Sequence, residues 1–161
     1  MAAQDTSRLP VVRTLEELAE LVGDRDDLYV RWSRGPDVDA CRTSRDELSG
    51  VPLPGLSASA LGVEPWWEDR DRSVWVARRL YDYRHLRERR SGPIRPWALE
   101  GRLCGRGPDN EPLVTDVRPV AWIDESLIRE ARERIEQLNG DWGSLDRPAA
   151  RLVDGAADGD G

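Results

Sequence analysis

The chain has 161 residues, of which 39% are hydrophobic and 34% charged, and its formal net charge is -7. This length predicts one domain with a modest core and excludes a large multidomain enzyme. All 24 residues in the lysine and arginine count are arginines, and there is one histidine, which excludes lysine-dependent chemistry and a histidine-rich metal site.

The same numbers limit location and partners. The acidic balance disfavours nucleic acid as a partner, because such a protein gains little from counterion release. No apolar stretch approaches the roughly 18 residues that a membrane span needs, and two cysteines are too few for a disulfide framework. We therefore expect a cytoplasmic protein without a membrane partner and without a metal site.

The first half of the chain predicts one helix and two strands. Residues 1–12 are polar, and we expect them to be flexible. Thr14 and Glu17 have the spacing of a capping box, which predicts a short amphipathic helix that Gly23 ends. Leu28–Ser33 reads as a strand, and 53–61 as a short strand with Ser57 and Ser59 on one face. The intervening stretch 34–55 has little periodicity, which indicates either a functional loop or an element that the pattern does not reveal.

The second half predicts two further helices and a hairpin. Ser73 is a good N-cap for a helix from 74 to about 86, and Asp124 caps the most regular helix, which Asn139 and Gly140 stop. Residues 97–103 alternate as a strand with one packed face, a loop spans 105–112, and a second strand resumes at 113–117. Pro119 ends or bulges that strand before it continues over 120–123. We expect an acidic disordered tail over 140–161.

These elements predict a single small α+β domain over 13–139, built on a mostly antiparallel sheet with three helices. The tryptophans are expected mainly in the core, where they replace the absent phenylalanine. Trp66 and Trp67 are adjacent, so we expect one of the two rings to lie at the surface, where it can contact a ligand or partner.

Four segments together resemble a known family. They are the strand from Leu28 onward to Pro36, residues 53–57, the helix 75–86 and the stretch 105–114. The family consists of short actinobacterial proteins that carry a domain of unknown function. The resemblance covers residues 14–138 and implies a domain extent without an activity.

A second resemblance concerns the order of three residues. Arg31 on a strand, the serine pair at Ser57 and Ser59, and Glu111 before an apolar strand resemble the Arg–Ser–Glu arrangement of ADP-ribosyltransferases. This resemblance implies NAD as cofactor, with Arg31 holding its pyrophosphate, Ser57 orienting the sugar and Glu111 stabilising the oxocarbenium-like centre. Tyr29, Trp32 or Tyr83 would stack on the nicotinamide. The sequence departs from the pattern at Ala58, at Asp109 and at Pro112.

A non-catalytic module is the favoured alternative. Here Arg31 is an outward residue of a strand, the serines belong to a solvated face, and 105–111 is a hairpin loop shaped by its glycines. Such a module needs no cofactor and binds an unknown protein or a small nucleotide-like ligand through Trp66, Trp67 and the loop from Gly105 to Glu111. The candidate ligand-binding residues are Tyr29, Ser59, Trp66, Arg106, Asp109 and Asn110.

Three weaker patterns remain open. His85 and Cys104 have the residue types of a nucleophile and its base, although a packed histidine and a core cysteine are the commoner arrangement. The arginine run over 84–95 reads first as a solvated face and second as an anion contact. Gly105-Arg106-Gly107 lacks the strand–glycine–helix order that a phosphate-binding fingerprint requires.

Overall fold

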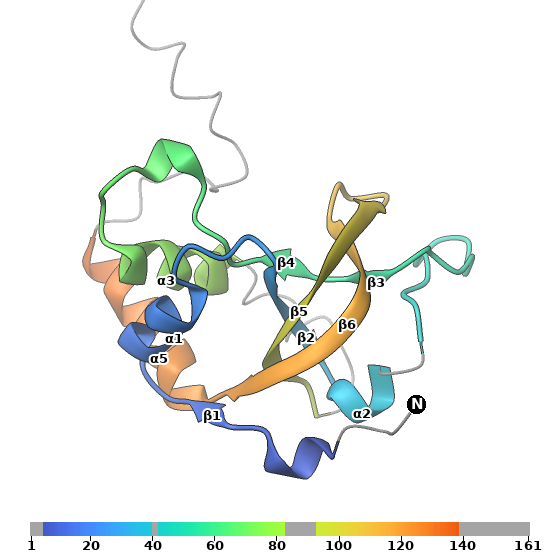
Figure 1. The fold of residues 1–161 in the computed structure, drawn as a ribbon, viewed down its shortest axis with the longest axis horizontal. Coiled ribbons are helices and arrows are strands. Elements are labelled where there is room, and N and C mark those ends of the chain that lie inside the picture. The colour runs from blue at the N-terminus through green and yellow to red at the C-terminus, as the bar shows by residue number, and fades with distance from the viewer. Residues whose placement is uncertain (1–4, 40–41, 83–92, 139–161) are drawn as a thin grey trace, which may run out of the picture.

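The computed structural model describes residues 5–39, 42–82 and 93–138. The three longest helices lie together on one side of the molecule, whereas the long strands and a four-residue helix lie on the other (Figure 1). In chain order the described elements are η1 (Thr6–Arg8), β1 (Val11–Val12), α1 (Leu15–Val22), β2 (Leu28–Ser33), α2 (Pro36–Asp39), β3 (Leu56–Ser57), β4 (Ser59–Ala60), η2 (Pro65–Trp67), α3 (Arg72–Asp82), β5 (Arg95–Arg106), β6 (Pro112–Ile123) and α5 (Glu125–Gln137). The predicted α+β class is confirmed. Within the described ranges, no helix is long and apolar enough to cross a bilayer.

The sheet is built around a hairpin of two twelve-residue strands, β5 and β6. The strand order is β1-β6-β5-β2-β4, with β3 also paired to β6, and the β1–β6 pairing is parallel while the others are antiparallel. β6 runs through Pro119, where the register shifts between Ala98 and Leu99 of β5. The bulge predicted at Pro119 is therefore present, and it lies inside one continuous strand. Bulges of this kind bend a hairpin.

The segment 56–60 closes the strands into a ring. Leu56 and Ser57 pair with β6, whereas Ser59 and Ala60 pair with β2. Since β2 also pairs with β5 and β5 with β6, the pairings form a closed circuit. The single strand predicted over 53–61 is thus wrong, because the chain switches partner at Ala58, which donates its N–H to the Pro112 carbonyl at 3.1 Å.

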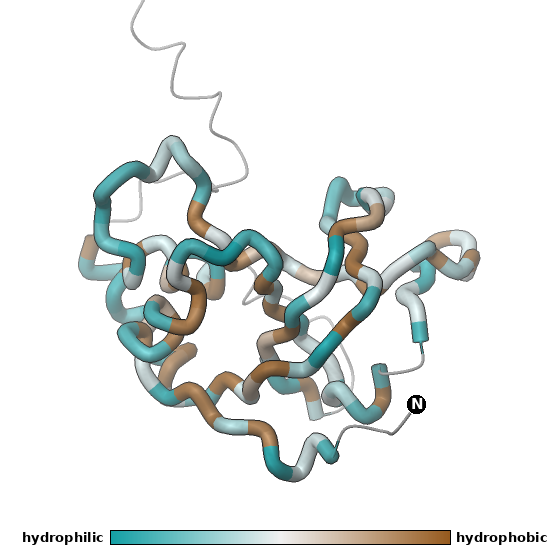
Figure 2. Tube along the Cα trace, viewed as in Figure 1, coloured by the Kyte–Doolittle hydropathy of each residue, from teal (hydrophilic) through white to brown (hydrophobic). Residues whose placement is uncertain are grey.

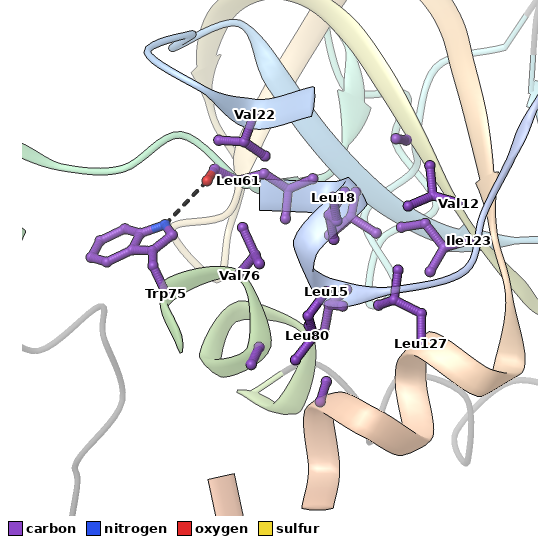
Figure 3. Packing of buried hydrophobic residues seen from close by; sticks show 14 of the residues in the cluster. Val12, Leu15, Leu18, Val22, Leu61, Trp75, Val76, Leu80, Ile123 and Leu127 are labelled. Carbon is purple, nitrogen blue, oxygen red and sulfur yellow. Dashed lines mark hydrogen bonds between the residues drawn. The ribbon is translucent and has the colours of Figure 1, made fainter. Parts of the chain in front are cut away.

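Each face of the sheet has its own core. The helical face buries aliphatic side chains from α1, α3, α5 and the ends of β1 and β6, and Figure 3 shows them converging. Each such side chain contributes about 1.5–3 kcal/mol when fully buried. The opposite face of the sheet holds a second cluster. The members of this second core are Tyr29, Ala58, Trp97, Leu99 and Val114.

The starts of α1 and α5 follow the predicted capping residues, whereas the start of α3 does not. Asn139 and Gly140, predicted to stop α5, lie outside the described residues. The Thr14 side chain accepts the Glu17 N–H at 3.1 Å, and Asp124 accepts the Ser126 N–H at 3.1 Å. At α3 the predicted N-cap Ser73 is wrong, because the helix begins at Arg72 and Asp71 accepts the N–H of Ser73 at 2.9 Å. Aspartate fits this position because its carboxylate favours the positive end of the helix. The predicted extension of this helix to residue 86 lies outside the described residues.

The N-terminal segment is more ordered than predicted. Val11 and Val12 form β1 beside Trp122 and Ile123, and the Pro10 carbonyl accepts the Trp122 N–H at 2.8 Å. Residues 6–12 therefore belong to the fold, because an edge of β6 was free to pair with them. The tail predicted over 140–161 lies outside the described residues.

Candidate functional site

The first candidate site lies where β2 meets α2, and it is centred on a buried ion pair. Arg31 is 9% exposed, and its Nε donates to Oδ2 of Asp39 at 2.7 Å. The hydroxyl of Ser33 donates to the same carboxylate oxygen at 2.6 Å. Ser33 in turn accepts the indole N–H of Trp97 at 2.9 Å, so the pair is tied to the second core. Close geometry and extra hydrogen bonds are what a buried ion pair needs to offset its desolvation.

Arg31 also reaches the strand segment that closes the ring. Its Nη1 donates to the backbone carbonyl of Ser57 at 2.7 Å and lies 3.5 Å from the hydroxyl of Ser44. That hydroxyl accepts the Ser57 N–H at 2.8 Å. The structure therefore brings together two predicted site residues, Arg31 and Ser57, through a main-chain oxygen. We call Arg31, Ser33, Asp39, Ser44 and Ser57 the anchor cluster.

Glu111 belongs to the turn between β5 and β6. Its Oε2 accepts the Asp109 N–H at 2.9 Å, and its carboxylate lies so close over Gly107 that a Cβ there would be 2.0 Å from Oε1. Arg106 donates to the Asn110 carbonyl at 3.0 Å, and Asn110 adopts a φ of 62°. Among the described residues, no hydrogen bond or ion pair joins Glu111 to the anchor cluster. The turn uses all four of these predicted residues for its own geometry.

The remaining predicted ligand-binding residues are at least partly buried. Tyr29 is 5% exposed in the second core, and burial, reinforced by Asp26 and Asp27, raises the pKa of its hydroxyl. Ser59 is 6% exposed in β4. Trp66 is half-buried, with its ring centroid 5.4 Å from that of Trp75.

The predicted core role of the tryptophans is confirmed for several of them. Trp67 is 2% exposed, Trp75 is 0% exposed and Trp97 is 1% exposed. Trp66 is the more exposed ring of the adjacent pair, but it packs on the helical core rather than standing free. The Trp66 ring therefore offers a ligand only part of its surface.

A second candidate site emerges from the stretch between α2 and β3, where sequence reasoning placed a loop without naming residues. Residues 44–53 form a short hairpin in which Asp46 donates its N–H to the Val51 carbonyl at 2.9 Å. Leu53 likewise donates to the Ser44 carbonyl at 2.7 Å. Arg45 and Pro52 form a β-bridge between these pairs. We call residues 44–53 the Leu48 hairpin.

A carboxylate fixes the tip of the Leu48 hairpin. Asp46 accepts the Ser49 hydroxyl at 2.5 Å and the backbone N–H groups of Ser49 at 3.2 Å and Leu48 at 3.4 Å. These bonds, the hydroxyl first, hold the pKa of Asp46 below its usual value. Gly50, at a φ of 69°, donates to the Asp46 carbonyl at 2.8 Å. A left-handed residue such as glycine is what a tight turn needs at this point.

The fixed tip leaves apolar side chains in water. Leu48 is 98% exposed and Val51 is 57% exposed. Figure 2 shows apolar colour at the outer end of this loop, far from α1, α3 and α5. The signal in the sequence was local: an Asp-x-x-Ser-Gly turn at 46–50 with a leucine inside it. The base of the hairpin is Ser44, which belongs to the anchor cluster, so the two candidate sites are one continuous structure.

The weaker sequence patterns find little support in the described residues. His85 lies outside them, so the structure does not show it beside Cys104, whose thiol is exposed. Residues 84–90 of the arginine run also lie outside them, and Arg95 stacks on Trp122 at 4.2 Å. In the part of the chain that the structure describes, no group of three or more histidine, cysteine, aspartate or glutamate residues is placed to hold a metal ion.

Comparisons with known proteins identify a family. The model of a family of unknown function, DUF6098, matches residues 5–143. A putative uncharacterized protein of Haemophilus influenzae is 31% identical over 88 residues, which is 53% of this chain and 32% of that protein. The chain thus spans about a third of the length of this relative. No solved structure matches at a significant level.

Proposed function

This chain belongs to DUF6098, a family of unknown function, and we propose that it is a non-catalytic module. The proposed module binds another protein through the Leu48 hairpin. The expected cytoplasmic location and actinobacterial source remain predictions that accompany this proposal.

The observation that carries the proposal is the exposure of Leu48 on an ordered turn. Its side chain is 98% exposed, while backbone bonds and the Asp46 carboxylate hold the turn on both sides. Burying such a side chain in a partner contributes about 1.5–3 kcal/mol. A turn that is already ordered loses little conformational entropy on binding, so more of that gain appears as affinity.

The anchor cluster supports the same reading. Arg31 directs Nε to Asp39 and Nη1 to the Ser57 carbonyl, both at 2.7 Å. These donors hold α2 and the base of the hairpin against β2, which leaves them committed within the protein. A pyrophosphate-binding arginine would instead present its planar fork to the ligand.

The competing function is the ADP-ribosyltransferase-like or NAD glycohydrolase-like enzyme, favoured by the contact between Arg31 and Ser57. It requires Glu111 to leave its turn and approach Arg31. A thermal-shift titration with NAD, ADP-ribose and nicotinamide decides between them. A site occupied at one hundred times its Kd gains about 2.7 kcal/mol. We expect no shift, and a saturable shift lost in Arg31→Ala and Glu111→Gln would establish the enzyme instead.

The binding function is tested by site-specific photocrosslinking. The full-length chain carries a photoreactive leucine analogue at position 48, and a matched protein carries it at Leu103, which is 48% exposed on β5. In extract of the source organism, we expect a discrete adduct at position 48 only. The captured protein, purified, should bind the wild-type chain and bind Leu48→Ser at least tenfold more weakly. No adduct above the Leu103 control, or equal binding of both chains, would refute the proposal.

A further inference from the structure

We infer that the partner of the Leu48 hairpin is a folded protein whose apolar pocket receives Leu48 and whose rim carries a cationic group for Glu47. This inference rests on the proposed function and names the chemistry of its partner. The tip then acts as a two-point ligand, with one aliphatic side chain beside one carboxylate.

The role of the Glu47 carboxylate is inferred from the contacts that the charged side chains at the tip make. Arg45 donates through Nη1 to the Gly50 carbonyl at 3.1 Å, and Asp46 accepts three hydrogen bonds inside the turn. Glu47 is exposed, and no hydrogen bond or ion pair joins it to another described residue. Glu47 is therefore the charge next to Leu48 that the hairpin itself does not use.

The shape of the tip favours a concave partner. Leu48 lies at the end of a narrow two-stranded projection and is almost wholly in water. One leucine on a convex turn fits a pocket of its own size, as anchor residues do at the centres of protein interfaces. An extended peptide would need a groove on this chain, and a convex tip does not supply one.

The charge of the tip disfavours other macromolecules. Asp46 and Glu47 directly precede Leu48, and the whole chain carries a formal net charge of -7. Anionic lipid surfaces attract basic segments with several apolar or aromatic residues, and nucleic acids attract basic patches. A cation at the rim of a protein pocket complements Glu47 and steers the encounter, so association should weaken as salt increases.

The test uses the full-length chain and the protein captured through position 48. Calorimetric titrations compare wild type, Leu48→Ala and Glu47→Gln at about 0.05 M and 0.5 M salt, where the screening length changes roughly threefold. Glu136→Gln and Leu103→Ala are matched controls on exposed positions of α5 and β5. We expect Kd to rise at least tenfold for Leu48→Ala and about three- to tenfold for Glu47→Gln. Neither control should change Kd, and Glu47→Gln should reduce the salt dependence.

The outcomes separate the inference from the proposed function. Loss of binding in Leu48→Ala together with an unchanged Kd in Glu47→Gln would overturn the cationic rim while the protein-binding function stands. An unchanged Kd in Leu48→Ala would overturn both. Sedimentation with phosphatidylserine vesicles is the last arm, and vesicle binding that Leu48→Ala abolishes would show that a lipid surface, not a protein pocket, receives the tip.

Discussion

Replacing Asp39 with alanine tests whether the anchor cluster holds the hairpin base to the strand ring. The Arg31 and Asp39 side chains are 10% and 9% exposed, with Nε and Oδ2 at 2.7 Å. The substitution leaves the guanidinium buried without its counter-ion, and such a change costs about 3–5 kcal/mol. The free energy of unfolding of a domain is about 5–15 kcal/mol, so Asp39→Ala should remove a large fraction of the stability.

Urea unfolding followed by tryptophan fluorescence measures this loss. Arg102→Ala is the control, because Arg102 and Asp116 form an ion pair at the surface, with side chains that are 75% and 74% exposed. Removing this ion pair should change the free energy of unfolding by less than about 1 kcal/mol. The double variant Arg31→Met with Asp39→Leu removes both charges and should recover much of the loss. If Asp39→Ala cost no more than Arg102→Ala, the anchoring role of the pair would be refuted.

Three further predictions concern other parts of the fold. Hydrogen bonds from Ser126, its hydroxyl first, lower the pKa of Asp124 in the folded state. The ionised Asp124 carboxylate contributes its full stabilisation above the ordinary aspartate pKa of about 3.9, and this contribution is lost as the pH falls through the lower pKa of the folded state. The urea midpoint of the wild-type protein should therefore decrease over this acidic range. Asp124→Asn should make that decrease smaller. Gly101→Ala should cost about 1–3 kcal/mol, because a Cβ would lie 2.3 Å from Val114 Cγ1, whereas Gly105→Ala meets nothing within 4 Å and should be nearly neutral in the same assay. Leu48→Ser should leave the melting temperature unchanged, since 98% of that residue is already exposed, and a drop of several degrees would show that Leu48 packs within the fold.

Local signals in the sequence predicted the elements with strong periodicity or strong capping. The Thr14–Glu17 box and Asp124 placed the starts of α1 and α5, and the loop predicted over 105–112 placed the β5–β6 hairpin. The missing parts depend on distant partners. β1 is two residues long and forms only because β6 offers a free edge, and the split of 56–60 between β6 and β2 has no local signature.

The candidate site was predicted in part, for the same reason. Arg31 and Ser57 were named, and they do meet. The role that we propose for them is structural, because Arg31 binds Asp39, which no sequence pattern singled out. Asp39 lies on the four-residue helix α2, which places its carboxylate against Arg31. The Leu48 hairpin lies within a stretch for which the sequence predicted no regular element, and a leucine in a polar stretch gives no sign of its exposure until the turn around it is known.

The central claim is that Leu48 carries the contact with a partner protein. A titration of the captured partner with wild type and Leu48→Ser tests it most directly, with Leu103→Ser as the control for losing an exposed leucine elsewhere. The account predicts at least a tenfold weaker Kd for Leu48→Ser and an unchanged Kd for Leu103→Ser. Equal affinity of all three chains would contradict it.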